Sequence, residues 1–306
     1  MKSRTRVVGA VLILFSLPVV LALSEALSFH ARNRNNGSIV SSGQKREYLL
    51  YVPRSYDRSK ATPLVISMHG AAGRPTQQMN LSEWNRLAES QRFIVVYPSG
   101  VESGGPRVWH VSEGPGLMRD VRFLSELIDK LEAAYNIDPA RIYVNGFSNG
   151  GGMAFVLSCA LSDRIAAVGM VGAAQTLPWS WCTENRAVPM IAFHGTADPE
   201  VPYNGGSSWV APRPFPSTPN WAANWAGRNG CRPDPVESTV AADVTRRAYT
   251  NCADDAAVVL YTIHGGGHTW PGGMPLPKWF VGRTTQSIHA TSLMWSFFSE
   301  HPLVRK

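Results

Sequence analysis

Mostly apolar, strand-like runs alternate with segments of helical spacing along most of this chain. The runs lie at residues 63–68, 93–97, 141–144, 166–171, 188–193 and 258–263. Continuous apolar runs are typical of parallel strands that helices cover on both faces of a sheet. Residues 121–134 place their apolar side chains on one helical face, and Asp120 is expected to cap that helix. The alternation predicts a doubly wound, mainly parallel α/β sheet in a single domain.

In such a sheet, functional side chains gather at the carboxyl ends of the strands. Residues 146–150 read Gly-Phe-Ser-Asn-Gly, the only G-x-S-x-G motif in the chain, and join a strand-like run to a helix rich in small residues. A sharp strand-to-helix turn exposes the serine, and the helix N-terminus behind it favours developing negative charge. We predict that Ser148 is a nucleophile. A purely structural glycine-rich turn is the alternative.

A serine hydroxyl needs a base to remove its proton, and eight histidines compete for that role. His268 follows three glycines in a tight loop after the last apolar run, at the carboxyl edge of the predicted sheet. His264 is the nearest rival, but it directly follows the run and is expected to be held at the strand end. His69 and His194 each precede a glycine at a strand end and are expected to hydrogen-bond within loops. We predict His268 as the general base.

The acid that orients this base should follow another strand, between the serine and the histidine in the sequence. Asp198 lies just after the run at 188–193, and the order serine, aspartate, histidine is that of one known class of serine hydrolase. Glu200, two residues further on, is the alternative.

The oxyanion formed by serine attack needs preorganised hydrogen-bond donors. The backbone N–H of Asn149 is one candidate, and the loop after residues 63–68 should supply the second from Ala71, with Ala72 as the alternative. No metal or organic cofactor is expected, since the chain has no H-E-x-x-H, no G-x-x-x-x-G-K and no G-x-G-x-x-G after a first strand.

Two tryptophans lie near these motifs. Trp270 is two residues from His268, and Trp109 is in a long loop within reach of the cleft. Flat aromatic rings suit a phenolic acyl group, a sugar ring or a polyester chain. We predict that Trp109 and Trp270 bind substrate, with packing in the core as the alternative.

The N-terminus has the layout of a secretory signal. In residues 1–24, three basic residues precede the uncharged stretch 7–23, and small residues follow. An uncleaved anchor formed by residues 7–23 is the alternative, and it would be the chain's only contact with a membrane. Residues 25–43 are polar and are predicted to form a tether. Residues 44–300 are predicted to form the catalytic domain. The chain is thus expected to be secreted or extracytoplasmic, in the periplasm or at the cell surface.

The four cysteines are an even number in a chain predicted for an oxidising compartment. Local pairing, Cys159–Cys182 and Cys231–Cys252, is predicted. A metal site is the alternative, but the chain contains no C-x-x-C pair.

The formal net charge is +7, and three of the positive charges lie in the leader. The remaining excess is small, and no basic run with interleaved aromatic residues is present. A nucleic-acid partner is therefore not expected.

Taken together, these motifs resemble the extracellular polyhydroxybutyrate depolymerases and the feruloyl and acetylxylan esterases of carbohydrate esterase family one. The resemblance runs from about Lys45 to Phe298. It rests on His69-Gly70, Trp109, and the sequences at 146–151, 194–198, 201–203, 229–231 and 266–272. It implies an α/β-hydrolase that cleaves carboxylic esters, with Ser148, Asp198 and His268 at the positions of the family's triad. Ala71 departs from the pattern, because some members carry a cysteine there.

We therefore predict an exported serine esterase that works through an acyl-enzyme. The expected substrates are feruloyl or acetyl esters linked to polysaccharide, or hydroxyalkanoate polyesters. A serine peptidase of the same fold and a surface binding module with a decayed catalytic site are the alternatives.

Overall fold

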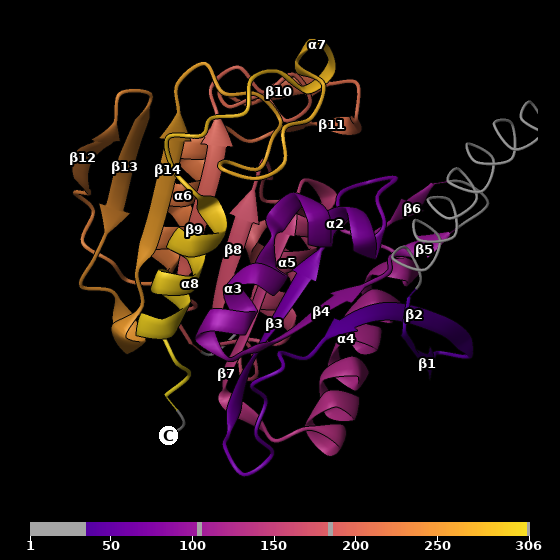
Figure 1. Ribbon diagram of the computed structural model, residues 1–306. Helices are drawn as coiled ribbons and strands as arrows, with labels where there is room; N and C mark the ends of the chain where they lie inside the picture. Colours follow the sequence, from indigo (N-terminus) through magenta and orange to yellow (C-terminus); the bar gives the residue numbers. More distant parts are fainter. Residues whose placement is uncertain (1–34, 103–105, 183–185, 305–306) are drawn as a thin grey trace, which may run out of the picture. The chain divides into compact units, whose positions relative to one another are not determined.

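The computed structural model describes residues 35–102, 106–182 and 186–304, so the predicted leader and the first part of the predicted tether lie outside the described residues (Figure 1). Its centre is a 10-stranded sheet. In spatial order the strands are β1 (Gly37–Ser41), β2 (Gln44–Tyr51), β4 (Ile94–Pro98), β3 (Thr62–Met68), β7 (Ile137–Phe147), β8 (Ala167–Val171), β9 (Met190–Gly195), β14 (Val258–Ile263), β13 (Val244–Tyr249) and β12 (Val236–Ala241). The strands from β4 to β14 in this order are parallel, and antiparallel strands flank them on both sides.

Helices cover both faces of the sheet (Figure 1). One face packs against α2 (Pro75–Ser82), α3 (Trp84–Gln91) and α8 (Ala290–Glu300), and the other against α4 (Pro115–Ala134), α5 (Asn149–Ala160) and α6 (Thr218–Arg228). The pleat of β3 distributes its side chains between the two layers: Leu64 and Ile66 belong to the α4–α5 side, and Val65 to the α3–α8 side. The predicted doubly wound α/β sheet is therefore confirmed.

Several short elements lie in the segments between the main strands and helices. They are β5 (Val101–Glu102), β6 (Arg107–Val108), η1 (Trp179–Trp181), β10 (Gly206–Ser208), β11 (Ala211–Phe215), η2 (Ala253–Asp255) and α7 (Lys278–Val281). Within the described residues, no helix combines the length and the apolar character needed to cross a membrane.

The predicted tether extends too far along the chain. Residues 37–41 form β1, which pairs with β2 in register from Gly37 opposite Tyr48 to Ser41 opposite Gln44. The two residues between the strands, Ser42 and Gly43, have φ of 49° and 74°. Two successive positive φ angles are typical of a tight β-hairpin, so this polar stretch extends the sheet.

The helix predicted to begin at Asp120 also begins earlier. α4 starts at Pro115, and Asp120 is a fully buried residue inside the helix. Its carboxylate bonds to Arg46 and His110 instead of capping the helix.

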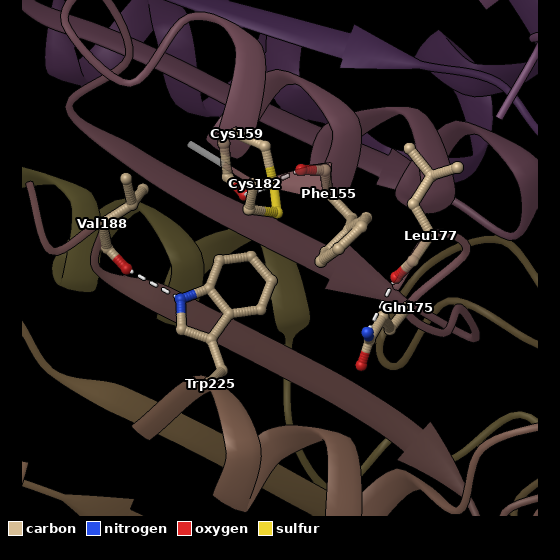
Figure 2. The surroundings of a disulfide bond; sticks show 8 residues. Phe155, Cys159, Gln175, Leu177, Cys182, Val188 and Trp225 are labelled. Carbon is tan, nitrogen blue, oxygen red and sulfur yellow. Dashed lines mark hydrogen bonds between the residues drawn. A yellow bond between two sulfur atoms is a disulfide. The ribbon is translucent and has the colours of Figure 1, made fainter. Parts of the chain in front are cut away.

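Both disulfides have the predicted local pairing. Cys159 bonds to Cys182, and Cys231 to Cys252. Cys159 lies near the end of α5, beside Phe155 and the buried Trp225, whose Nε1 donates to the Val188 carbonyl at 3.0 Å (Figure 2). The bond to Cys182 therefore fastens the C-terminal end of the helix that begins directly after Ser148.

Candidate active site

Ser148 lies in a sharp turn between β7 and α5. Its backbone has φ 52° and ψ −121°, an uncommon conformation for a residue with a side chain. The turn also requires both flanking glycines. A Cβ at Gly146 would come within 2.2 Å of the Gly150 carbonyl, and a Cβ at Gly150 within 2.4 Å of the Met68 carbonyl oxygen. The local geometry is that of a nucleophile elbow.

His268 and Asp198 are joined by a short hydrogen bond. His268 Nδ1 lies 2.8 Å from Asp198 Oδ2, and both side chains are buried. The other carboxylate oxygen, Oδ1, accepts the backbone N–H groups of Glu200 at 2.9 Å and Val201 at 2.8 Å. Burial disfavours the charged form of Asp198, but the hydrogen bond from His268 and the adjacent imidazoles outweigh burial and keep the pKa of this carboxyl below its usual value.

His194 contacts the same carboxylate oxygen of Asp198 as His268 does. Its Nε2 lies 2.8 Å from the Val201 carbonyl oxygen and 3.4 Å from Asp198 Oδ2, and its Nδ1 lies 3.2 Å from Thr218 Oγ1. Complete burial lowers the pKa of His194. As expected from the sequence, this histidine hydrogen-bonds within its loop.

The strand ends bring His268 beside the serine turn. The imidazole of His268 packs on the ring of Phe147, the residue before Ser148, with ring centroids 4.7 Å apart. Gly172, just after β8, fits beneath both rings, because a Cβ there would lie 3.1 Å from His268 Nδ1 and 3.4 Å from Phe147. The three predicted triad residues thus stand at one edge of the sheet, after β7, β9 and β14.

The loops that carry Asp198 and His268 pack backbone against backbone. A Cβ at Gly195 would approach the Gly266 carbonyl oxygen to 2.2 Å, and a Cβ at Gly267 would approach the Val281 carbonyl oxygen to 2.0 Å. The His268 N–H also donates to the Val281 carbonyl at 2.6 Å. The contact at Gly195 brings the loops of Asp198 and His268 together, and the two contacts to Val281 hold the His268 loop against the end of α7.

Glu200 approaches the other ring nitrogen of His268. Its Oε2 lies 3.5 Å from His268 Nε2, whereas Asp198 occupies Nδ1. The alternative role of Glu200 as the orienting acid therefore does not fit the structure.

The loop after β3 lies against Ser148. A Cβ on Gly70 would come 3.2 Å from the Ser148 Cβ, and the Gly73 N–H closes a turn on the Gly70 carbonyl at 3.0 Å. Within this turn, Ala72 donates its N–H to the Arg107 carbonyl at 2.8 Å and is not available to an oxyanion. Ala71 is exposed and stays the candidate donor from this loop.

The two predicted substrate-binding tryptophans are in the core. Trp109 is 2% exposed, and its Nε1 donates to the His69 carbonyl at 3.1 Å. Trp270 is 0% exposed, and its Nε1 donates to Thr291 Oγ1 at 3.0 Å. Neither ring can stack on a substrate in this arrangement, so this prediction does not agree with the structure. The position of each tryptophan in a loop gave no sign of the buried hydrogen-bond acceptor that its indole N–H contacts.

Known proteins resemble this chain in sequence and in fold. The family model described as Phospholipase/Carboxylesterase matches residues 107–210. Feruloyl esterase B of Piromyces equi is 33% identical over 229 residues, which are 73% of this chain and 42% of that protein, so the match spans less than half of that relative. Feruloyl esterase C of Emericella nidulans is 27% identical over 299 residues, 92% of this chain and 97% of that protein. The solved acetyl xylan esterase from Aspergillus awamori shares the fold, with a TM-score of 0.63 and 17% identity over 86% of this chain and 98% of that chain.

Proposed function

Because the chain belongs to the esterase family of α/β-hydrolases, we propose that it hydrolyses carboxylic esters with Ser148, His268 and Asp198 as its catalytic triad. The observation that carries the proposal is the 2.8 Å bond between His268 Nδ1 and Asp198 Oδ2. It orients the imidazole so that Nε2 is left to take the serine proton. The fold alone would not suffice, since related folds host many activities.

In the proposed reaction, His268 Nε2 takes the Ser148 proton as the serine Oγ bonds to the ester carbonyl carbon. Backbone N–H groups of Asn149 and Ala71 donate to the oxyanion that forms. His268 then returns the proton to the departing alcohol as the ester C–O bond breaks, which leaves an acyl group on Ser148. Water then attacks the acyl carbon as His268 Nε2 takes a proton from it. The bond from that carbon to the Ser148 oxygen breaks, and His268 returns the proton to that oxygen as the carboxylic acid leaves.

The proposed substrates are feruloyl or acetyl esters attached to polysaccharide. Support comes from similarity to proteins named feruloyl esterase and acetyl xylan esterase. Export of the enzyme is part of the same proposal. The two disulfides support export, because such bonds persist in oxidising compartments.

The test compares wild type with Ser148→Ala on an aryl acetate, methyl ferulate, acetylated xylan and polyhydroxybutyrate. We expect hydrolysis of a feruloyl or acetyl ester, and a loss of about 10³-fold or more in the variant, because serine and base act as one unit. A fluorophosphonate should label Ser148 alone. Ser292→Ala, an exposed position on α8, is the matched control. Labelling at another serine, or folded wild type that cleaves none of these esters, would contradict the proposal.

A further inference from the structure

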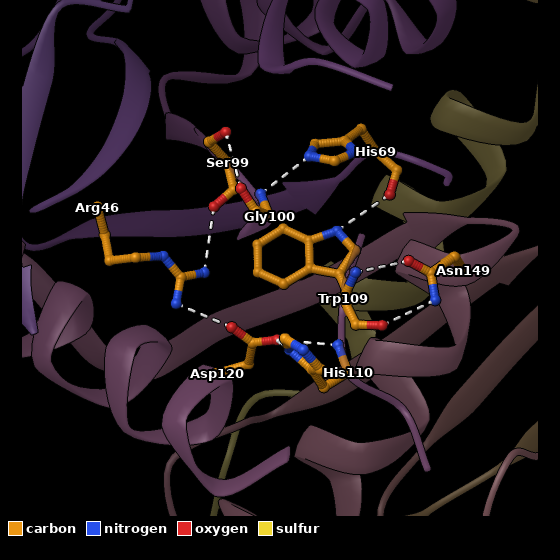
Figure 3. A network of polar contacts seen from close by, with 8 residues as sticks. All are labelled: Arg46, His69, Ser99, Gly100, Trp109, His110, Asp120 and Asn149. Carbon is orange, nitrogen blue, oxygen red and sulfur yellow. Dashed lines mark hydrogen bonds and ion pairs between the residues drawn. The ribbon is translucent and has the colours of Figure 1, made fainter. Parts of the chain in front are cut away.

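The side chain of Asn149 is clamped by the backbone of one residue. The Trp109 N–H donates to Asn149 Oδ1 at 2.7 Å, and Asn149 Nδ2 donates to the Trp109 carbonyl at 3.1 Å (Figure 3). Asn149 is the first residue of α5 and directly follows the strained Ser148. The clamp therefore holds the peptide whose N–H is one proposed oxyanion donor.

Trp109 also reaches the opposite side of the proposed oxyanion hole. Its Nε1 donates to the His69 carbonyl at 3.1 Å, at the start of the loop that carries Ala71. His69 Nε2 accepts the Gly100 N–H at 3.0 Å, so its proton is on Nδ1, which lies 2.7 Å from the Gly70 carbonyl oxygen. Trp109 thus joins the segments that carry both donors.

A buried ion pair completes the circuit around the indole. Asp120 Oδ2 accepts from the backbone N–H of His110 at 2.9 Å and from its Nδ1 at 2.8 Å, and Oδ1 accepts from Arg46 at 2.8 Å. Arg46 also donates to the Ser99 carbonyl at 3.2 Å, next to Gly100. The side chain of Asp120 is 0% exposed and that of Arg46 is 6% exposed. Figure 3 shows the indole inside this closed loop of contacts.

We propose that the Asn149 side chain and the Arg46–Asp120 pair are positioning residues that hold the two oxyanion donors at their working separation. This inference rests on the proposed esterase function. Donors stabilise an oxyanion only when they are aimed in advance at the place where the charge develops. A backbone with positive φ at Ser148 needs surrounding contacts to keep its neighbour aimed. Buried ion pairs add little to stability on average, so a role in fixing geometry accounts better for this one.

Asn149→Ala is the decisive variant, because it removes the clamp and keeps the backbone N–H. We expect kcat on an aryl acetate to fall about 10- to 100-fold with KM changed less than about twofold. Affinity for phenylboronic acid, whose adduct on Ser148 places an oxygen in the hole, should fall by a similar factor, whereas the melting temperature should stay near that of wild type. Asp129→Asn, which removes a surface pair with Arg164 from the same helix as Asp120, is the control and should leave all of these values unchanged.

Asp120→Asn tests the remote end of the circuit. Both side chains bond to the same stretch of backbone, Asn149 to Trp109 and Asp120 to His110. Asn149→Ala/Asp120→Asn should therefore lose no more kcat than the worse single variant, whereas independent effects would multiply. If Asp120→Asn does not fold, Asn149→Ala alone decides. Wild-type kcat and boronate affinity in Asn149→Ala would overturn the inference while leaving the esterase proposal intact. Wild type without esterase activity would overturn both.

Discussion

The Glu200 carboxylate lies 3.5 Å from Nε2 of His268, on the side of the imidazole opposite Asp198. The ring therefore stands between two carboxylates, and only Asp198 contacts the nitrogen that orients it. Nε2 is the atom that must take the serine proton in the proposed reaction. The Glu200 side chain is 16% exposed, so solvent screens its charge only in part.

Glu200→Gln should lower kcat on an aryl acetate by about 3- to 10-fold. The Glu200 carboxylate lies 3.5 Å from His268 Nε2, so it favours the positive charge that forms on the imidazole as the serine proton is taken. Asp198 keeps its bond to the other ring nitrogen and continues to orient the imidazole. The measurement is kcat on an aryl acetate at one fixed pH, with the exposed Glu300→Gln as control. An unchanged kcat would show that Glu200 does not act on His268.

Trp270→Ala should destabilise the protein, and its effect should not be confined to the choice of ester. Removal of a fully buried indole that also hydrogen-bonds Thr291 should lower the free energy of unfolding by about 3–5 kcal/mol. Urea unfolding gives the value, and Trp279→Ala, at an 87% exposed position, should change it little. A variant with wild-type stability and a raised KM for aromatic esters only would restore the substrate-binding role first predicted for this residue.

His69 should make the fold sensitive to acid. Burial lowers the pKa of His69 from 6.5 to about 4, so the unfolded chain binds more protons between these values. The free energy of unfolding should therefore fall as the pH drops from 6.5 towards 4, by on the order of 3 kcal/mol, and His69 should add nothing further below that. Unfolding at stepped pH in wild type, His69→Asn and the exposed control His264→Asn measures this. Equal pH slopes in all three proteins would refute the assignment.

Reduction of the disulfides should lower the melting temperature. Each bond typically contributes about 2–4 kcal/mol, and the intact protein should contain no free thiol by mass. Cys159→Ala/Cys182→Ala removes only the bond at the end of α5. Cys231→Ala/Cys252→Ala removes only the other bond, so the two variants give the contribution of each. Four alkylatable thiols in folded protein isolated under oxidising conditions would contradict the pairing.

The sequence predicted the features that depend on local pattern. Continuous apolar runs alternating with helical segments predicted the fold, and several separate motifs, among them those that contain Ser148, Asp198 and His268, pointed to the esterase family that the comparisons support. The two glycines around Ser148 were informative because they leave no room for a Cβ. The catalytic roles of these residues stay predictions until they are tested by substitution.

Features that depend on distant partners could not be predicted in the same way. The buried indole of Trp109 donates its N–H to the carbonyl of His69, which lies forty positions earlier in the chain. Asp120 looked like a helix cap because the partner of its carboxylate, Arg46, is seventy-four positions away. Side-chain exposure and ionic pairing of this kind are decided by tertiary packing, which no local window contains.

The loops of Asp198 and His268 touch through backbone atoms with no side chain between them. This contact limits which substitutions the protein can accept. A Cβ at Gly195 would meet the Gly266 carbonyl in the loop of His268, so even alanine there would push the two loops apart. Alanine at Gly267 would instead push the His268 loop away from Val281 at the end of α7. In a saturation library selected for ester cleavage, these two glycines should be depleted of substitutions about as strongly as the triad itself. New substrate preferences would then have to arise elsewhere, for instance in the exposed residues of β10, β11 and α7, which can vary without separating the acid from the base.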